Sequence, residues 1–182
     1  MCFCDLWVAI LASTGAVFVA SFVLWMALPL HKGDHQVLPS EPEFKALLAQ
    51  HDPPVGRYTI GWRGPDGTFR TPPDPTLPRG LLLVQRGALS MGKPLVFWAL
   101  HLLVVSVLVA YTSSIVLPHG ADGTTVFRLT SVIALLAYGG GAVPKAIWDG
   151  VPWKQVPTAL VDALVYAAVT GGVFLWLWPK AA

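Results

Sequence analysis

The sequence predicts an all-α membrane protein: four transmembrane helices with a small extramembrane loop of mixed α and β structure between the first and second helices. Three observations lead to this fold class. Hydrophobic residues make up 54% of the 182 positions and charged residues only 12%, about half of the charged share of an ordinary soluble domain. Four apolar runs are each long enough to cross a bilayer. Between the first two runs lies a stretch rich in proline, glycine and charge.

The four apolar runs cover about residues 6–30, 95–117, 127–148 and 156–178. The first run contains no charge and has Trp7 and Trp25 near its ends, where indole rings prefer the membrane interface. A short connector after the third run indicates that the third and fourth helices are antiparallel neighbours. We therefore expect one membrane domain over residues 1–182, with little chain left for a second folded unit.

The loop, residues 31–93, is predicted to contain a short helix over about residues 41–50 and a β-hairpin over about residues 57–70. Ser-Glu-Pro-Glu at residues 40–43 is typical of a helix N-terminus. Gly-Pro-Asp-Gly at residues 64–67 is typical of a tight turn between two strands. So few elements form a small cap on the membrane domain and not an independent domain.

The basic residues indicate which side of the membrane the loop faces. Four crossings place the loop and the third connector on the same side, which carries ten of the twelve Lys and Arg residues, whereas Arg128 and Lys180 lie on the other side. The side richer in Lys and Arg usually remains in the cytoplasm. We therefore expect a multi-pass protein of the cell membrane with both termini outside and the loop of residues 31–93 in the cytoplasm.

Three ionisable residues lie inside the spans at a similar depth on the loop side: His101, Lys145 and Asp162. Ionisable groups at membrane depth are costly and commonly mark functional sites. One interpretation is a proton-accepting or cation-binding site in which Asp162 meets His101, with Tyr166 one turn further along the same helix. The other is a polar clasp, in which Asp162 pairs with Lys145 or His101 and fixes how three helices pack. The clasp is favoured, because a single acidic residue gives little support to a transport pathway.

The third and fourth spans carry signals of close packing. Gly140, Gly141 and Pro144 are expected to kink the third span, because proline cannot donate its backbone hydrogen bond. Broken helices occur at transport sites, but a packing notch explains the same residues and is favoured. In the fourth span a stripe of small residues recurs at every fourth position and lets another helix approach closely. Its members are Ala159, Ala163, Ala167 and Gly171.

Weak metal-binding patterns occur at two places in the sequence. His31, Asp34 and His35 follow the first span and offer nitrogen and oxygen ligands for a divalent cation, although a solvated turn is the favoured interpretation. Cys2 and Cys4 are too close in sequence for a typical structural disulfide, and they have no two further ligands nearby in sequence for a metal. We therefore expect inert or lipid-modified thiols at this end of the chain, and no cofactor.

Several classes of function are disfavoured by the sequence. The formal net charge is only +2 and the basic residues are dispersed, so a nucleic-acid partner is not expected. The sequence contains no Gly-rich phosphate loop, no nucleophile elbow and no zinc-protease helix. These observations favour a protein that is not an enzyme.

Residues 38–48, Gly-Arg-Tyr at residues 56–58 and residues 78–92, followed by three spans, resemble a group of uncharacterised bacterial membrane proteins of similar size. The resemblance covers nearly the whole chain. It implies a bacterial inner membrane and supplies no catalytic residue.

The packing features favour a non-enzymatic accessory, assembly or structural component of a membrane complex. Its expected partners are the lipid bilayer and either another membrane protein or a second copy of the chain. The alternative is a small transport or proton-coupled protein that uses Asp162 and His101 as an intramembrane pair.

Overall fold

The structure is a computed structural model that describes residues 2–61, 64, 66–68, 76, 79–87 and 90–181. Four helical segments in this part of the chain are long and apolar enough to span a membrane: Phe3–Ala27, Gly92–Val116, Gly123–Trp148 and Gln155–Leu177. Each contains 23 to 26 residues, which at 1.5 Å per residue exceeds the roughly 30 Å of a hydrocarbon core. The prediction of a mostly helical protein with four such segments is confirmed, and the fold is compatible with a multi-pass membrane protein.

The first segment consists of a 3₁₀ turn (Phe3–Leu6), α1 (Trp7–Phe22) and a π-helical turn (Val23–Ala27). The second is α3 (Gly92–Val116), the third is α4 (Gly123–Gly139) with α5 (Ala142–Trp148), and the fourth is α6 (Gln155–Leu177). α4 begins before the predicted residue 127, because the Asp122 side chain accepts a hydrogen bond from the Thr125 backbone N–H at 3.0 Å. That bond satisfies one of the free N–H groups in the first turn of the helix.

The third segment is interrupted at Gly140 and Gly141. The backbone N–H of Gly140 still donates to the backbone carbonyl of Leu136 at 3.0 Å, and α5 begins two residues later at Ala142. Pro144 lies in the first turn of α5. Backbone N–H groups in the first turn have no hydrogen-bond acceptor within the helix, so a proline there costs no hydrogen bond. The two glycines therefore lie at the break itself, and the proline begins the next helix.

Glycine permits the close contact between α4 and α6, which pack along much of their length. A Cβ atom added at Gly139 would lie 3.1 Å from the Cβ of Ala163. A Cβ added at Gly171 would overlap the Ser131 hydroxyl and lie 3.0 Å from the Phe127 ring. Larger side chains at these two positions would separate the helices.

The interior of the bundle receives side chains from all four segments. Its fully buried apolar members include Leu6, Val17, Leu102, Val109, Val126 and Phe174. Hydroxyl side chains are also buried there, at Ser13, Ser106, Thr130 and Thr170. In the small-residue stripe of α6, Ala163, Ala167 and Gly171 are buried and Ala159 is half-buried.

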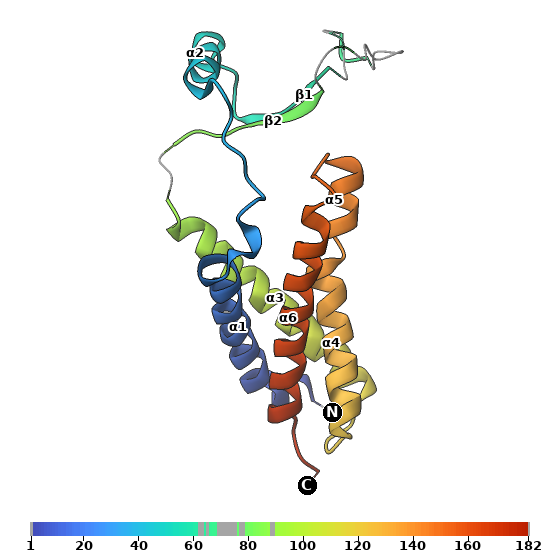
Figure 1. Cartoon of the computed structure of the whole chain (residues 1–182). Helices are drawn as coiled ribbons and strands as arrows, with labels where there is room; N and C mark the ends of the chain where they lie inside the picture. The colour runs from blue at the N-terminus through green and yellow to red at the C-terminus, as the bar shows by residue number, and fades with distance from the viewer. Residues whose placement is uncertain are drawn as a thin grey trace.

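We call the described residues between Ala27 and Gly92 the extramembrane segment; its helix and strands lie beyond the end of the bundle opposite to the two chain termini (Figure 1). Its elements are a short 3₁₀ turn (Pro29–His31), α2 (Glu41–His51), β1 (Gly56–Ile60) and β2 (Gly80–Val84). β1 and β2 pair in antiparallel fashion, with Tyr58 opposite Leu82. The small cap thus contains one helix and a two-stranded sheet.

The strand that pairs with β1 differs from the predicted one. The sequence predicts a return strand directly after the turn at residues 64–67. The turn is present, since the Gly67 N–H donates to the Gly64 carbonyl at 3.0 Å, but Thr68 is not in a strand and residues 69 and 70 lie outside the described residues. β1 pairs instead with β2, which contains three leucines and a valine.

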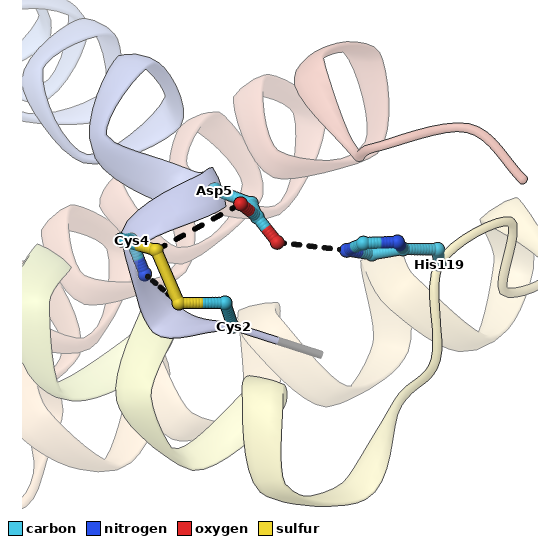
Figure 2. Close-up of a disulfide and its surroundings, with 4 residues drawn as sticks. All are labelled: Cys2, Cys4, Asp5 and His119. Carbon is cyan, nitrogen blue, oxygen red and sulfur yellow. Dashed lines mark hydrogen bonds and ion pairs between the residues drawn. A yellow bond between two sulfur atoms is a disulfide. The ribbon is translucent and has the colours of Figure 1, made fainter. Parts of the chain in front are cut away.

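Cys2 and Cys4 are joined by a disulfide (Figure 2), which corrects the expectation of free thiols. An extended chain would hold residues i and i+2 about 7 Å apart. The 3₁₀ turn that begins at Phe3 brings the two Cα atoms to 5.3 Å, within the roughly 4.4 to 6.8 Å that disulfides span.

Candidate functional site

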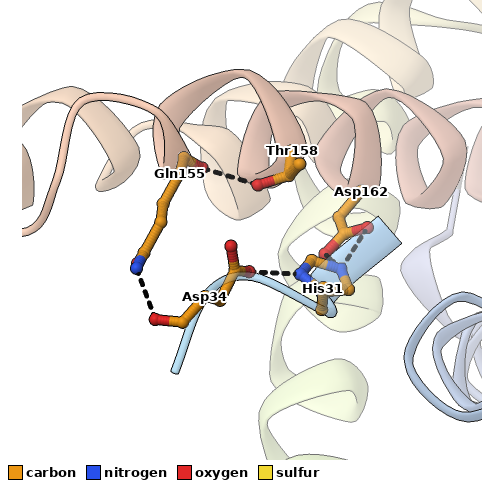
Figure 3. Close-up of polar contacts among 5 residues, drawn as sticks. All are labelled: His31, Asp34, Gln155, Thr158 and Asp162. Atoms are coloured by element: carbon orange, nitrogen blue, oxygen red, sulfur yellow. Dashed lines mark hydrogen bonds and ion pairs between the residues drawn. The ribbon is translucent and has the colours of Figure 1, made fainter. Parts of the chain in front are cut away.

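The strongest polar site lies where the first span meets the extramembrane segment. After the π-helical turn, Pro29 begins a 3₁₀ turn that ends at His31. The imidazole of His31 stacks on the indole of Trp25, with ring centroids 3.9 Å apart and planes 7° apart. This stacking directs the two ring nitrogens of His31 toward α6 and toward the chain that follows (Figure 3).

His31 lies between two carboxylates, those of Asp34 and Asp162, and we call these three residues the His31 cluster. Nδ1 of His31 is 2.7 Å from Oδ2 of Asp34, and Nε2 is 3.2 Å from Oδ2 of Asp162. Ionised carboxylates only accept hydrogen bonds, so a His31 that bonds both of them carries a proton on each nitrogen. With both carboxyl groups ionised, the cluster is an imidazolium between two carboxylates.

Burial and charge act in opposite directions on His31. Burial lowers the pKa of His31, but its hydrogen bonds and ion pairs with Asp34 and Asp162 outweigh burial and raise the pKa above its ordinary value. Only 8% of the His31 side-chain surface is exposed, with 15% for Asp34 and 9% for Asp162. Little water is present to screen the charges, which favours the protonated imidazole.

Two further contacts hold the extramembrane segment against the bundle. The side-chain amide of Gln155, the first residue of α6, donates to the backbone carbonyl of Asp34 at 2.7 Å (Figure 3). Nη2 of Arg57, a residue of β1, is 2.6 Å from Oδ1 of Asp149, which lies in the connector before α6. The first contact and the His31 cluster lie side by side, so residues 31–34 are fastened to the first two turns of α6.

A pocket of about 260 Å³ opens beside the cluster. Its polar lining comes from His31, Asp34, Asp162, Thr158 and Lys145, the last on α5. Lys145 thus lines the same pocket as the two carboxylates, although no ion pair joins it to them within the part of the chain that the structure describes. The pocket therefore presents acidic, basic and hydroxyl groups together at one end of the membrane domain.

The predicted pair of Asp162 and His101 is not brought together. His101 is an exposed residue of α3. Its ring stacks on that of Trp98 and meets the ring of Tyr138 edge-on, with ring centroids 5.5 Å and 6.3 Å apart. Asp162 receives a different imidazole, that of His31. Counting residues along a span estimates depth but not the direction in which a side chain points, and the His101 ring packs against Trp98 and Tyr138 instead of Asp162.

The other predicted site residues are distributed between the interior and the surface. Tyr166 is buried one turn after Asp162, and its ring meets the edge of Tyr138 at 5.5 Å. His31 and Asp34 belong to the cluster, whereas His35 is exposed and does not join them. Among the described residues, these three side chains do not form a convergent set of metal ligands.

The role of His31 as the partner of Asp162 was missed from the sequence. The available signal is the His-x-x-Asp spacing of His31 and Asp34 directly after a span, because residues three apart share a face of a helical turn. His31 and Asp162 are 131 positions apart in the sequence, so no local sequence pattern predicts their contact.

This arrangement allows two kinds of chemistry. The imidazolium and its two carboxylates form a charge-assisted fastener between a loop and a helix. The same groups exchange protons near neutral pH, because histidine titrates there.

Comparisons with protein families, with curated protein sequences and with solved structures each find no match to this chain. The resemblance to bacterial membrane proteins therefore remains a prediction, and function is inferred from geometry.

Proposed function

We propose that this protein is a non-enzymatic accessory component of a membrane complex, and that its extramembrane segment contacts the partner protein. The observation that carries this proposal is that the segment exposes large apolar side chains, while none of its described residues is buried. No residue of α2, β1 or β2 is buried. An isolated two-stranded sheet is marginally stable in water, so packing against the surface of a partner protein would stabilise these elements.

The exposed apolar residues are spread over the whole segment. Val37 is 85% exposed, Val55 64% and Leu83 63%, and Leu47 of α2 is also exposed. Single exposed apolar residues are common on soluble surfaces, and we infer an interaction surface here because these residues lie on elements in which no described residue is buried. Among the described residues each strand pairs only with the other, and an extended segment of a partner can add to the outer edge of such a sheet by backbone hydrogen bonding.

The contacts at the base of the segment support the same proposal. The His31 cluster, the Gln155 amide and the Arg57 ion pair hold the segment on one end of the bundle. A surface held in this way loses less conformational freedom on binding than a free loop does. The clasp interpretation of Asp162 fits this role, with His31 as the partner.

The proposed location is a bacterial cytoplasmic membrane, with both termini outside and the extramembrane segment in the cytoplasm. The distribution of Lys and Arg supports this orientation. The partner is then a membrane protein with a cytoplasmic surface, or a cytoplasmic protein recruited to the membrane.

The proposal is tested by affinity purification of the tagged chain from its native membrane in a mild detergent, with quantitative mass spectrometry. We expect a partner at a stoichiometric ratio. Leu83→Glu should reduce its recovery about tenfold or more, since a charge in an apolar contact costs well over 1.4 kcal/mol. The control is Lys45→Glu on the exposed face of α2, 72% exposed, which should retain the partner. Recovery of the chain alone would contradict the accessory role.

A second candidate is a proton-coupled membrane protein, favoured by one specific observation. From Asp162, polar side chains continue along the same face of α6 at Tyr166 and Thr170, both buried, and Tyr138 of α4 meets Tyr166 edge-on. Such a row of hydroxyl groups can hold water and conduct protons. Proton flux into liposomes that contain the purified protein, lost in Asp162→Asn with the fold retained, would favour this candidate over the first.

A further inference from the structure

A second cluster of reactive side chains lies at the opposite end of the bundle, beside the chain termini. Cys2, Cys4 and Asp5 belong to the first turn of the chain, and His119 comes from the connector between α3 and α4 (Figure 2). Among the described residues, Cys2, Cys4 and Asp5 are the one set of three His, Cys, Asp or Glu side chains whose ligand atoms all lie within 4.8 Å of one another.

Three of these four side chains lie close enough together to share an ion, and the fourth, His119, contacts Asp5. Cys4 Sγ is 3.8 Å from Asp5 Oδ1, and Asp5 Oδ2 is 2.8 Å from His119 Nε2. Donor atoms at 2.0 to 2.3 Å from a tetrahedral zinc ion are roughly 3.3 to 3.8 Å apart. His119 lies outside the set of three mutually close donors and contacts only its Asp5 member, so the imidazole must move toward the two sulfurs, once the disulfide opens, for all four groups to surround a common centre.

His119 is held near the cysteines by contacts that are independent of them. The Trp178 indole donates to the Pro118 carbonyl at 3.1 Å, and the Gly120 N–H donates to the Pro179 carbonyl at 2.8 Å. These bonds fix the residues on both sides of His119 against the C-terminal end of α6. The fourth ligand is thus supplied by a supported connector 114 positions away from Asp5, which the spacing in the sequence does not reveal.

We propose that the reduced form of this end of the protein binds one Zn²⁺ ion through Cys2, Cys4, Asp5 and His119. A mixed set of two thiolates, a carboxylate and an imidazole suits zinc, whereas copper(I) prefers soft sulfur ligands throughout. The cluster is exposed, so an ion reaches it directly from solvent.

Zinc binding and the disulfide exclude each other, because both use the same two sulfur atoms. Reduction of the Cys2–Cys4 bond takes up two electrons and two protons and gives two thiols. A trialkylphosphine supplies the electrons in the experiment and becomes the phosphine oxide, with water supplying the oxygen atom and the two protons. Zinc then displaces the two thiol protons, because thiolates are the ligands. Bound zinc in turn protects both sulfurs from oxidation.

The test uses the full chain, purified in detergent and divided into an untreated sample and a phosphine-reduced sample kept without oxygen. Each is titrated with Zn²⁺ against a chromophoric chelator, and with Co²⁺ to observe thiolate-to-metal absorption. We expect one zinc per reduced chain, release of two protons, and no binding to the disulfide form. Because the oxidised and reduced samples are the same protein, their circular dichroism spectra show whether the fold is equal in both.

Variants separate the proposed site from adventitious binding. The double variant Cys2→Ser, Cys4→Ser should abolish zinc binding, and His119→Ala should weaken it about 10- to 100-fold. His51→Ala, at an exposed histidine of α2 on the opposite end of the molecule, is the matched control and should leave the affinity unchanged. Zinc that binds equally to the oxidised protein, or to the double serine variant, would overturn the proposal.

Discussion

Removal of the His31 imidazole is the most informative perturbation of the fold. His31→Ala deletes two charge-assisted hydrogen bonds and leaves the carboxylates of Asp34 and Asp162 facing each other with little access to water. Each such bond contributes about 1.5 kcal/mol or more, so we expect a loss of about 3 kcal/mol. For a chain of this length that corresponds to a decrease in Tm of about 6 to 12 °C.

The assay is thermal unfolding in detergent, followed by far-UV circular dichroism, with a double-mutant cycle. Asp162→Asn removes the charge that His31 neutralises, so the double variant should be destabilised by at least about 1 kcal/mol less than the two single variants added together. His35→Ala is the control, because His35 is exposed and four residues further along the same loop.

Two results would refute this reasoning about the His31 cluster. One is a His31→Ala variant that unfolds within about 0.5 kcal/mol of His35→Ala, as an ordinary surface substitution does. The other is strict additivity in the cycle, which would mean that His31 and Asp162 stabilise the protein independently.

Three further predictions concern pH, packing and orientation. Because the pKa of His31 is raised, its stabilisation is complete below about pH 6.5 and is lost as the pH rises through the folded pKa. Thermal stability of the wild type should therefore fall above neutral pH, and that of His31→Ala should fall less. Gly171→Ala should unfold with about 1 to 3 kcal/mol less stability than Gly172→Ala, because a Cβ at Gly172 meets nothing within 4 Å and both changes gain the same helix propensity. Cys2 and Cys4 are the only cysteines, so a membrane-impermeant maleimide should label reduced intact cells if the termini face out; labelling only after lysis would reverse the orientation.

The spans were predictable from the sequence because burial in lipid requires long apolar runs, and such runs are visible without tertiary information. Their ends were less predictable. The N-terminus of α4 depends on the Asp122 side chain, which extends the helix beyond the apolar run. Local capping therefore decides where a helix begins even when hydropathy decides that it exists.

The partners of Asp162 and β1 could not be predicted for a different reason. Both are set by contacts between distant parts of the chain: Asp162 with His31, and β1 with β2 across residues outside the described part of the structure. An acidic residue inside an apolar run indicated that Asp162 needs a partner. Which of several histidines turns toward it depends on helix rotation, and a single sequence carries no direct record of that rotation.

The π-helical turn at Val23–Ala27, closed by the Leu28 N–H to the Val23 carbonyl at 3.1 Å, determines an angle as well as a length. It holds one more residue per turn than an α-helix, and each residue advances the chain by about 100° around the axis. Deleting one residue there would shorten the span by only about 1.5 Å, which a bilayer readily accommodates. The same deletion would rotate His31 by about a quarter of a turn away from Asp162. At this position we therefore expect the protein to tolerate a small change in the length of the span far better than a change in the direction in which His31 points.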